Sequence, residues 1–93
     1  MLRALFTTAT VLVAGCVTAP PVQEMSDARQ AISAAEEAPA DRVSADTLAD
    51  ARRLLEEAER LIQQEAYGPA RLNAVRAKNR AIDAVRSSED ARN

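Results

Sequence analysis

The feature that most constrains the fold is a set of alanines at helical spacing in the last third of the chain. They recur every three or four residues and comprise Ala70, Ala74, Ala77, Ala81 and Ala84. This spacing places their methyl groups on one face of an α-helix. Hydrophobic residues make up 47% of the chain but aromatic residues only 2%, so the apolar content is mostly alanine, a strong helix former that buries little area. The sequence therefore predicts an all-α fold with a small core.

Two earlier segments have the pattern of amphipathic helices. Over residues 22–38 the apolar positions are three and four residues apart, and comprise Met25, Ala28, Ile32 and Ala35. Over residues 45–66 the stripe is more regular and contains larger side chains: Leu48, Ala51, Leu55, Ala58 and Ile62. Pro39 should end the first helix, and residues 39–44 should form a linker. Ser44 suits the N-cap of the second helix, and Asp46 favours the positive end of its dipole.

The residues Tyr67-Gly68-Pro69 predict a short turn between the second helix and a third over residues 69–88. Glycine suits a helix C-cap and proline suits the first helical position. A turn this short makes the two helices antiparallel, which places Ile62 near the region from Leu72 to Ala74 and Ala51 near Ala84. Large side chains of one helix then face the alanine seam of the other, as close packing requires.

The expected architecture is a small antiparallel helical hairpin or a coiled-coil-like three-helix bundle, over residues 22–93. Such a small core gives little stability, so we expect self-association through the alanine stripe of the first helix, or docking on a partner.

Several classes of function are excluded by residue content. The net charge of −2 gives no support to nucleic-acid binding, which needs many cations to displace phosphate counterions. Without histidine or a second cysteine, the chain lacks ordinary zinc sites and Ser-His or Cys-His nucleophile pairs, and we expect no metal and no cofactor. The carboxylates of Glu56, Glu57 and Glu59 are interpreted as a solvated helix face, where Glu56 can pair with Arg60. We expect no enzymatic activity.

The first fifteen residues have the features of an export signal. Arg3 precedes an apolar run from residue 4 to 13, which is too short to span a bilayer. The residues Val13-Ala14-Gly15-Cys16 resemble the bacterial lipobox. This resemblance implies cleavage between Gly15 and Cys16, with S-diacylglycerol and N-acyl groups on Cys16 as a lipid anchor. The alternatives are an ordinary signal peptide that leaves a free thiol, and a cytosolic protein with an apolar first helix.

Residues 16–21 are interpreted as the lipidated cysteine and a short tether that ends in two prolines, which favour an extended backbone. Position 17 is valine, whereas aspartate there marks inner-membrane retention in similar lipoproteins. By that resemblance we expect a bacterial cell-envelope protein at the periplasmic face of the outer membrane.

The third helix is basic, whereas the first two are acidic. Residues 24–65 contain eleven acidic and five basic side chains, and residues 66–93 contain three and six. The basic side chains of interest are Arg71, Arg76, Lys78, Arg80 and Arg86. They either form a solvated surface that balances the acidic helices or bind anionic lipid headgroups or an acidic cell-wall polymer.

Three stretches together resemble a family of short alanine-rich bacterial lipoproteins, grouped as domain of unknown function 4398. They are DARQAISAAEEA (27–38), LADARRLLEEAERLI (48–62) and the turn at 67–70 with its following alanines. The chain differs from that pattern at the turn, because its glycine follows the tyrosine. The resemblance implies an exported, lipid-anchored helical domain with no established activity.

The predicted function is therefore that of a membrane-anchored envelope lipoprotein that acts as a structural or protein-interaction module. Its partners would be membrane lipid through Cys16 and an envelope protein or a second copy, but no nucleic acid. The alternative is a spacer that contacts peptidoglycan. We expect that contact to be noncovalent, since the chain ends in Ala91-Arg92-Asn93 rather than in the lysine that murein lipoproteins join to peptidoglycan.

Overall fold

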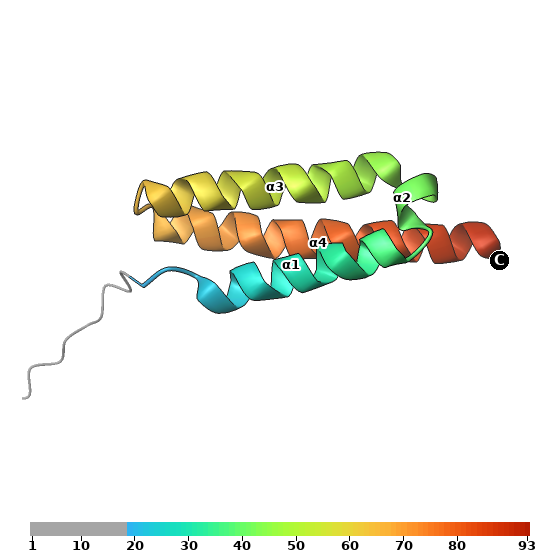
Figure 1. Ribbon diagram of the computed structural model, residues 1–93, viewed down its shortest axis with the longest axis horizontal. Coiled ribbons are helices and arrows are strands. Elements are labelled where there is room, and N and C mark those ends of the chain that lie inside the picture. Colours follow the sequence, from blue (N-terminus) through green and yellow to red (C-terminus); the bar gives the residue numbers. More distant parts are fainter. Residues whose placement is uncertain (1–18) are drawn as a thin grey trace, which may run out of the picture.

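A computed structural model describes residues 19–93 of the chain, except the side chain of Asp41 (Figure 1). The described part contains three long helices, α1 (Val22–Glu37), α3 (Ala45–Gln63) and α4 (Tyr67–Arg92), and one short helix, α2 (Ala40–Val43). The all-α prediction is confirmed, and of the two architectures it left open the chain adopts the three-helix bundle. The predicted signal peptide, its cleavage site at Gly15-Cys16 and the lipid on Cys16 lie outside the described residues.

Prolines set both ends of α1. The helix begins directly after Pro20-Pro21, and its first turn is closed by the Met25 N–H, which donates to the carbonyl of Pro21 at 3.0 Å. At the other end Ala38 has extended backbone with ψ of 164°. The ring of Pro39 disfavours helical geometry in the residue before it, so the helix stops there.

The segment expected to be a linker contains the short helix α2. Its single turn is closed by the Val43 N–H, which donates to the carbonyl of Pro39 at 3.1 Å. Ser44 does occupy the N-cap position of α3, but its side chain makes no capping hydrogen bond. The expectation of a serine cap was therefore wrong. The backbone of Ser44, with φ of −127° and ψ of 40°, departs from the extended conformation that a capping serine usually adopts.

The turn between α3 and α4 lies before Tyr67, and not at Tyr67-Gly68-Pro69 as the sequence predicts. The N–H of Ala66 donates to Leu61 at 2.8 Å and the N–H of Glu65 to Ile62 at 2.9 Å, which is the pattern of a Schellman motif. Glu65 holds the left-handed position of this motif, with φ of 59°. Glycine is therefore not the C-cap in this chain.

Gly68 and Pro69 instead belong to the first turn of α4. The N–H groups of a first turn have no partner within the helix, so a proline there removes no hydrogen bond. The first bond of α4 runs from the Ala70 N–H to the Ala66 carbonyl at 3.0 Å. For this reason α4 begins two residues earlier than predicted, and it continues to Arg92 rather than to residue 88.

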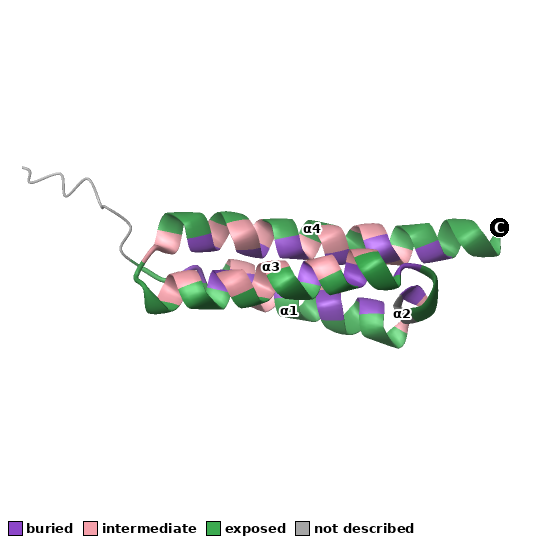
Figure 2. Cartoon of the chain, turned by 90° about the horizontal axis from the view of Figure 1, so that it is seen from above, coloured by how far each residue is buried: buried purple, intermediate pink, exposed green. Residues whose placement is uncertain are grey.

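The two views of the bundle show α4 running along both other long helices (Figures 1 and 2). It is antiparallel to α3, with which it shares the most extensive contact, and α1 packs mainly on α4 and much less on α3. The alanine seam therefore serves two neighbours instead of the one expected from the sequence. All of its members are fully buried: Ala70, Ala74, Ala77, Ala81 and Ala84.

Two clusters of buried residues form the core. The larger contains residues from all four helices: Ile32, Ala35, Ala40, Leu48, Ala51, Ala81 and Ala84. The smaller joins Met25, Ala58 and Ala74, with Leu55 and Ile62 packed against it. Leu48 is the largest side chain that is fully buried. A narrow core of methyl groups filled by few large side chains follows from the alanine-rich sequence.

The alanine stripe of α1 is occupied within the molecule. Met25, Ala28, Ile32 and Ala35 are all buried. The stripe is therefore not the surface for self-association that we expected, because these side chains already pack within the bundle.

Candidate functional site

The larger side chains predicted to face the seam lie where an antiparallel register requires. Leu48 and Ala51 share a cluster with Ala81 and Ala84. Ala58 shares the second cluster with Ala74, and Ile62 packs against that cluster. Leu55 contacts both clusters and is half-buried, as Ile62 is. These residues hold the three helices together and expose no reactive group.

The five basic residues of interest on α4 do not share one face. Arg71 and Arg80 are nine residues apart, which at about 100° per residue places them on opposite flanks of the helix. Arg71 lies 3.5 Å from Glu24 of α1, and Arg80 lies 3.1 Å from Asp50 of α3. Two of the five therefore pair with acidic neighbours on either side of α4. Of the others, Arg76 and Arg86 are exposed and Lys78 is half-buried.

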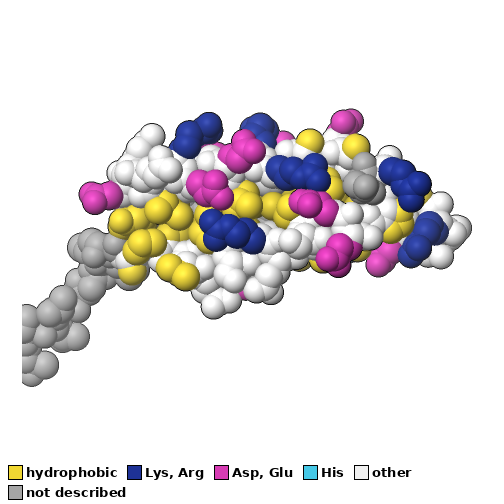
Figure 3. All heavy atoms as spheres, in the orientation of Figure 1, with side chains coloured by type: hydrophobic (Ala, Val, Ile, Leu, Met, Phe, Trp, Pro, Cys, Tyr) yellow, Lys and Arg dark blue, Asp and Glu magenta, His cyan; other side chains and the backbone are white. Residues whose placement is uncertain are grey.

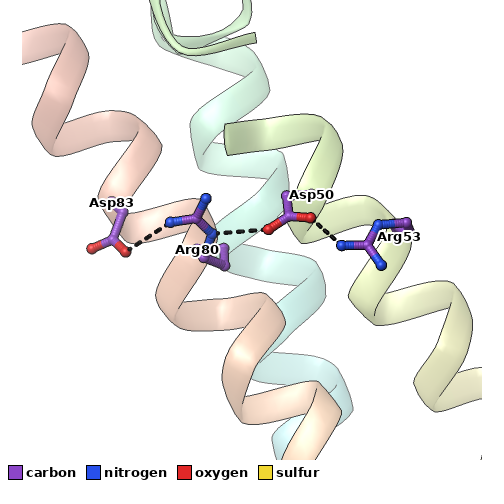
Figure 4. A network of polar contacts seen from close by, with 4 residues as sticks. All are labelled: Asp50, Arg53, Arg80 and Asp83. Carbon is purple, nitrogen blue, oxygen red and sulfur yellow. Dashed lines mark hydrogen bonds and ion pairs between the residues drawn. The ribbon is translucent and has the colours of Figure 1, made fainter. Parts of the chain in front are cut away.

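A chain of four charged side chains connects α3 with α4 (Figure 4). Asp50 accepts hydrogen bonds from Arg53 in its own helix and from Arg80 across the interface, and Arg80 also lies 3.7 Å from Asp83. The hydrogen bond from Arg53 lowers the pKa of the Asp50 carboxyl, and Arg80 adds to this, while burial opposes it. Asp50 therefore stays ionised and orients both arginines.

Sequence reasoning missed this network, although the antiparallel register contained a signal for it. Placing Ala51 beside Ala84 places Asp50 opposite Val85, five residues or about 7.5 Å along the helix from Arg80, which a long arginine side chain can cover. Two more ion pairs join α1 to α3, from Arg29 to Glu59 at 3.4 Å and from Arg52 to Glu36 at 3.5 Å. All these groups are partly exposed, so each pair adds little stability.

The three carboxylates interpreted above as a solvated helix face differ in their surroundings. Glu57 pairs with Arg60 in the next turn, and Glu59 reaches Arg29 of α1, while Glu56 is exposed. The expected pair of Glu56 with Arg60 is not the one formed. Glu57 projects about 100° away from Glu56 and about 160° away from Glu59, so the three carboxylates do not converge on one point.

An open depression of 450 Å³ lies where α2 meets α3, beside the last part of α4. Its lining consists of Arg42, Val43, Ser44, Ala45, Asp46, Thr47 and Ser87. One cation and one anion face it together with hydroxyl groups, and Asp46 already occupies the positive end of the α3 dipole. None of these lining residues is a histidine or a lysine that could activate one of the hydroxyl groups.

Within residues 19–93, no group of three or more acidic side chains is placed to hold a metal ion. In the same region no helix is both long and apolar enough to cross a membrane.

A family model covers residues 23–93, that is, the whole bundle except its first helical residue. The model is described as Domain of unknown function (DUF4398). The chain belongs to this family. No curated protein and no solved structure matches it. The DUF4398 region of this chain is thus the bundle in which α4 contacts both other long helices.

Proposed function

We propose that this protein is an exported lipoprotein of the bacterial envelope, held at a membrane by acyl groups on Cys16. The bundle would act as a structural or protein-interaction module without catalysis, and Val17 favours the periplasmic face of the outer membrane. The observation that carries the proposal is the sequence Val13-Ala14-Gly15-Cys16, six residues before α1 begins. Two or three acyl chains hold a protein stably at a bilayer, whereas a single chain does so only marginally.

The arrangement of the bundle supports a role without catalysis. Its buried interior consists of aliphatic side chains and two serines. Several of its charged groups pair between helices, such as Arg80 with Asp50 and Arg71 with Glu24, and the three carboxylates of α3 do not converge on one point. What remains for function is the outer surface, which suits contact with another envelope protein or with a second copy.

The anchor is tested by labelling cells with an alkyne analogue of palmitate. The wild-type chain should acquire the label, and Cys16→Ala should not. Intact mass spectrometry of the purified protein should show a chain that begins at Cys16 and carries the added mass of the acyl groups. An unprocessed chain that begins at Met1, or a mature chain with a free thiol, would contradict the proposal.

The type of partner is tested by crosslinking in intact envelopes. A crosslinked protein band that is lost when exposed residues of the bundle are changed supports an interaction module. If the protein is instead retained on purified peptidoglycan after detergent washing, the spacer function replaces it. Neither test depends on knowing the partner in advance.

A further inference from the structure

The two ends of the bundle differ sharply in charge. We call residues 19–25 and 61–70 the tether end, and residues 36–46 and 86–93 the far end. Only two of the 17 residues of the tether end are charged, Glu24 and Glu65. Nine of the 19 residues of the far end are charged: Glu36, Glu37, Asp41, Arg42, Asp46, Arg86, Glu89, Asp90 and Arg92.

The tether end is also the more apolar of the two. Val22 is 71% exposed, although it is a large aliphatic residue at the first position of α1. Pro20 and Pro69 are exposed and Tyr67 is half-buried. On the face drawn in Figure 3, hydrophobic side chains gather at this end, whereas basic and acidic groups spread along the rest of the molecule.

An ion pair with Arg71, the residue that directly follows the tether end, offsets one of its two negative charges. Glu24 lies 3.5 Å from Arg71, so Glu65 is the only charged residue of this end for which no such pair is formed within residues 19–93. The same contact shows that the start of α1 lies beside the start of α4. Both therefore adjoin the α3–α4 turn, and the described chain begins at this end (Figure 1).

Chain length places this end close to the lipid. Ala19 follows Cys16 by three positions, and a fully extended chain spans at most about 3.6 Å per residue, or roughly 11 Å in all. The headgroup layer on each side of a bilayer is about 6 Å thick. Acyl groups on Cys16 would therefore hold Ala19 at or just above the headgroups.

We propose that the tether end rests on the lipid interface, so that the bundle stands on the membrane and directs its charged far end away from it. This inference rests on the lipid anchor proposed above. Apolar side chains and tyrosine are favoured at the interface, and few charges would lose water there. If the bundle lay flat, exposed charges along its length would lie against the bilayer, and these include carboxylates such as that of Glu56, which anionic headgroups repel.

Single-cysteine labelling of the lipidated full-length chain tests this orientation. Lipidation consumes the thiol of Cys16, so a cysteine placed elsewhere can be labelled alone with an environment-sensitive fluorophore. Suitable exposed positions are Gln64→Cys in the tether end, Glu56→Cys and Asn79→Cys midway on α3 and α4, and Ser87→Cys in the far end. Each variant is reconstituted into phosphatidylethanolamine and phosphatidylglycerol vesicles that contain lipids with a quencher near the headgroup.

The label at Gln64→Cys should lose most of its fluorescence, and the label at Ser87→Cys should lose none. The distance along α4 from residue 67 to residue 87 is 20 helical residues, or about 30 Å. A bundle that lies flat would give strong quenching at Ser87→Cys together with strong quenching at one of the two midway labels, Glu56→Cys or Asn79→Cys. That result would overturn the proposal. So would the absence of quenching at Gln64→Cys.

Failure of the anchor and failure of the orientation give different results. Without the anchor, the protein does not float with the vesicles and its mass lacks the acyl groups. With the anchor but another orientation, the protein floats and carries the acyl groups, but the quenching pattern changes. Circular dichroism of each labelled variant checks that the helices are retained.

Discussion

Glu65 occupies a backbone conformation that favours glycine. Its φ of 59° lies in the left-handed region, where a side chain costs roughly 1 kcal/mol relative to glycine. Glu65 is exposed and forms no ion pair within residues 19–93. We therefore expect Glu65→Gly to stabilise the bundle by about 1 kcal/mol, measured as a higher midpoint of urea unfolding.

The same change at Glu56 provides a matched control with the opposite sign. Glu56 is exposed in the interior of α3, where glycine is destabilising by about 1 kcal/mol. Both variants lose one negative charge, so charge alone predicts the same shift for both. Equal shifts of the two midpoints would show that the left-handed conformation contributes nothing.

The stability that Asp50 contributes should depend on pH. Hydrogen bonds from Arg53 and Arg80 lower the pKa of this carboxyl in the folded state. A carboxyl with a lowered pKa stabilises the fold above its unfolded pKa, near 3.9, and this contribution is lost as pH falls through the folded pKa. Asp50→Asn should therefore lower the melting temperature at pH 7 and have a smaller effect at pH 2.

Melting curves followed by circular dichroism between pH 7 and pH 2 measure this difference. Glu56→Gln is the control, because Glu56 is exposed and the hydrogen bonds to Asp50 stay intact. A pH dependence of Asp50→Asn that runs parallel to that of the wild type would contradict the interpretation. The effect should be modest, since the Asp50 side chain remains 32% exposed.

At the scale of the elements, the sequence predicts the long helices well and the connections poorly. Periodic apolar positions such as Leu48, Ala51 and Ala58 identify a helix face, because burial on one side repeats with the helical turn. A four-residue helix such as α2 is too short to show any period. Gly68 and Pro69 are compatible with both a turn and a first helical turn, so their presence could not locate the boundary.

Charged contacts were predictable only in part, for a related reason. The antiparallel register brings Asp50 within reach of the long side chain of Arg80, so this pair was predictable from the sequence. The contact of Arg71 with Glu24 required knowing that α1 packs on α4. No periodic pattern specifies which neighbouring helix a stripe will face.

The alanine seam of α4 should tolerate no increase in volume. Ala81 is fully buried between residues of α1 and α3, and added methylenes there force the helices apart. We expect Ala81→Leu to destabilise the bundle by about 1–3 kcal/mol, measured by urea unfolding. Ala49→Leu makes the same change at an exposed position of α3 and should leave the midpoint nearly unchanged. A similar loss in both variants would mean that helix propensity, and not packing, decides the outcome.

At the scale of the molecule, one cluster of buried residues takes members from all four helices. A small domain with a shared core usually unfolds in one cooperative step. A second possibility is that unfolding takes two steps, because α1 packs mainly on α4 and could separate from an α3–α4 hairpin. A change confined to α1 and a signal that arises elsewhere can distinguish the two cases.

Ile32 of α1 and Tyr67 of α4 provide that combination. Ile32 lies in the shared cluster, and Tyr67 is the only tyrosine in a chain without tryptophan, so its fluorescence reports on the tether end. Removing one methyl group by Ile32→Val should cost about 0.5–1.5 kcal/mol. In a cooperative bundle the urea midpoints from tyrosine fluorescence and from circular dichroism fall together by the same amount. Val22→Ala, at a position of α1 that is 71% exposed, should move neither midpoint appreciably. A tyrosine midpoint that stays fixed while the dichroism curve broadens would show that α1 separates first, and that the α3–α4 hairpin is the cooperative unit.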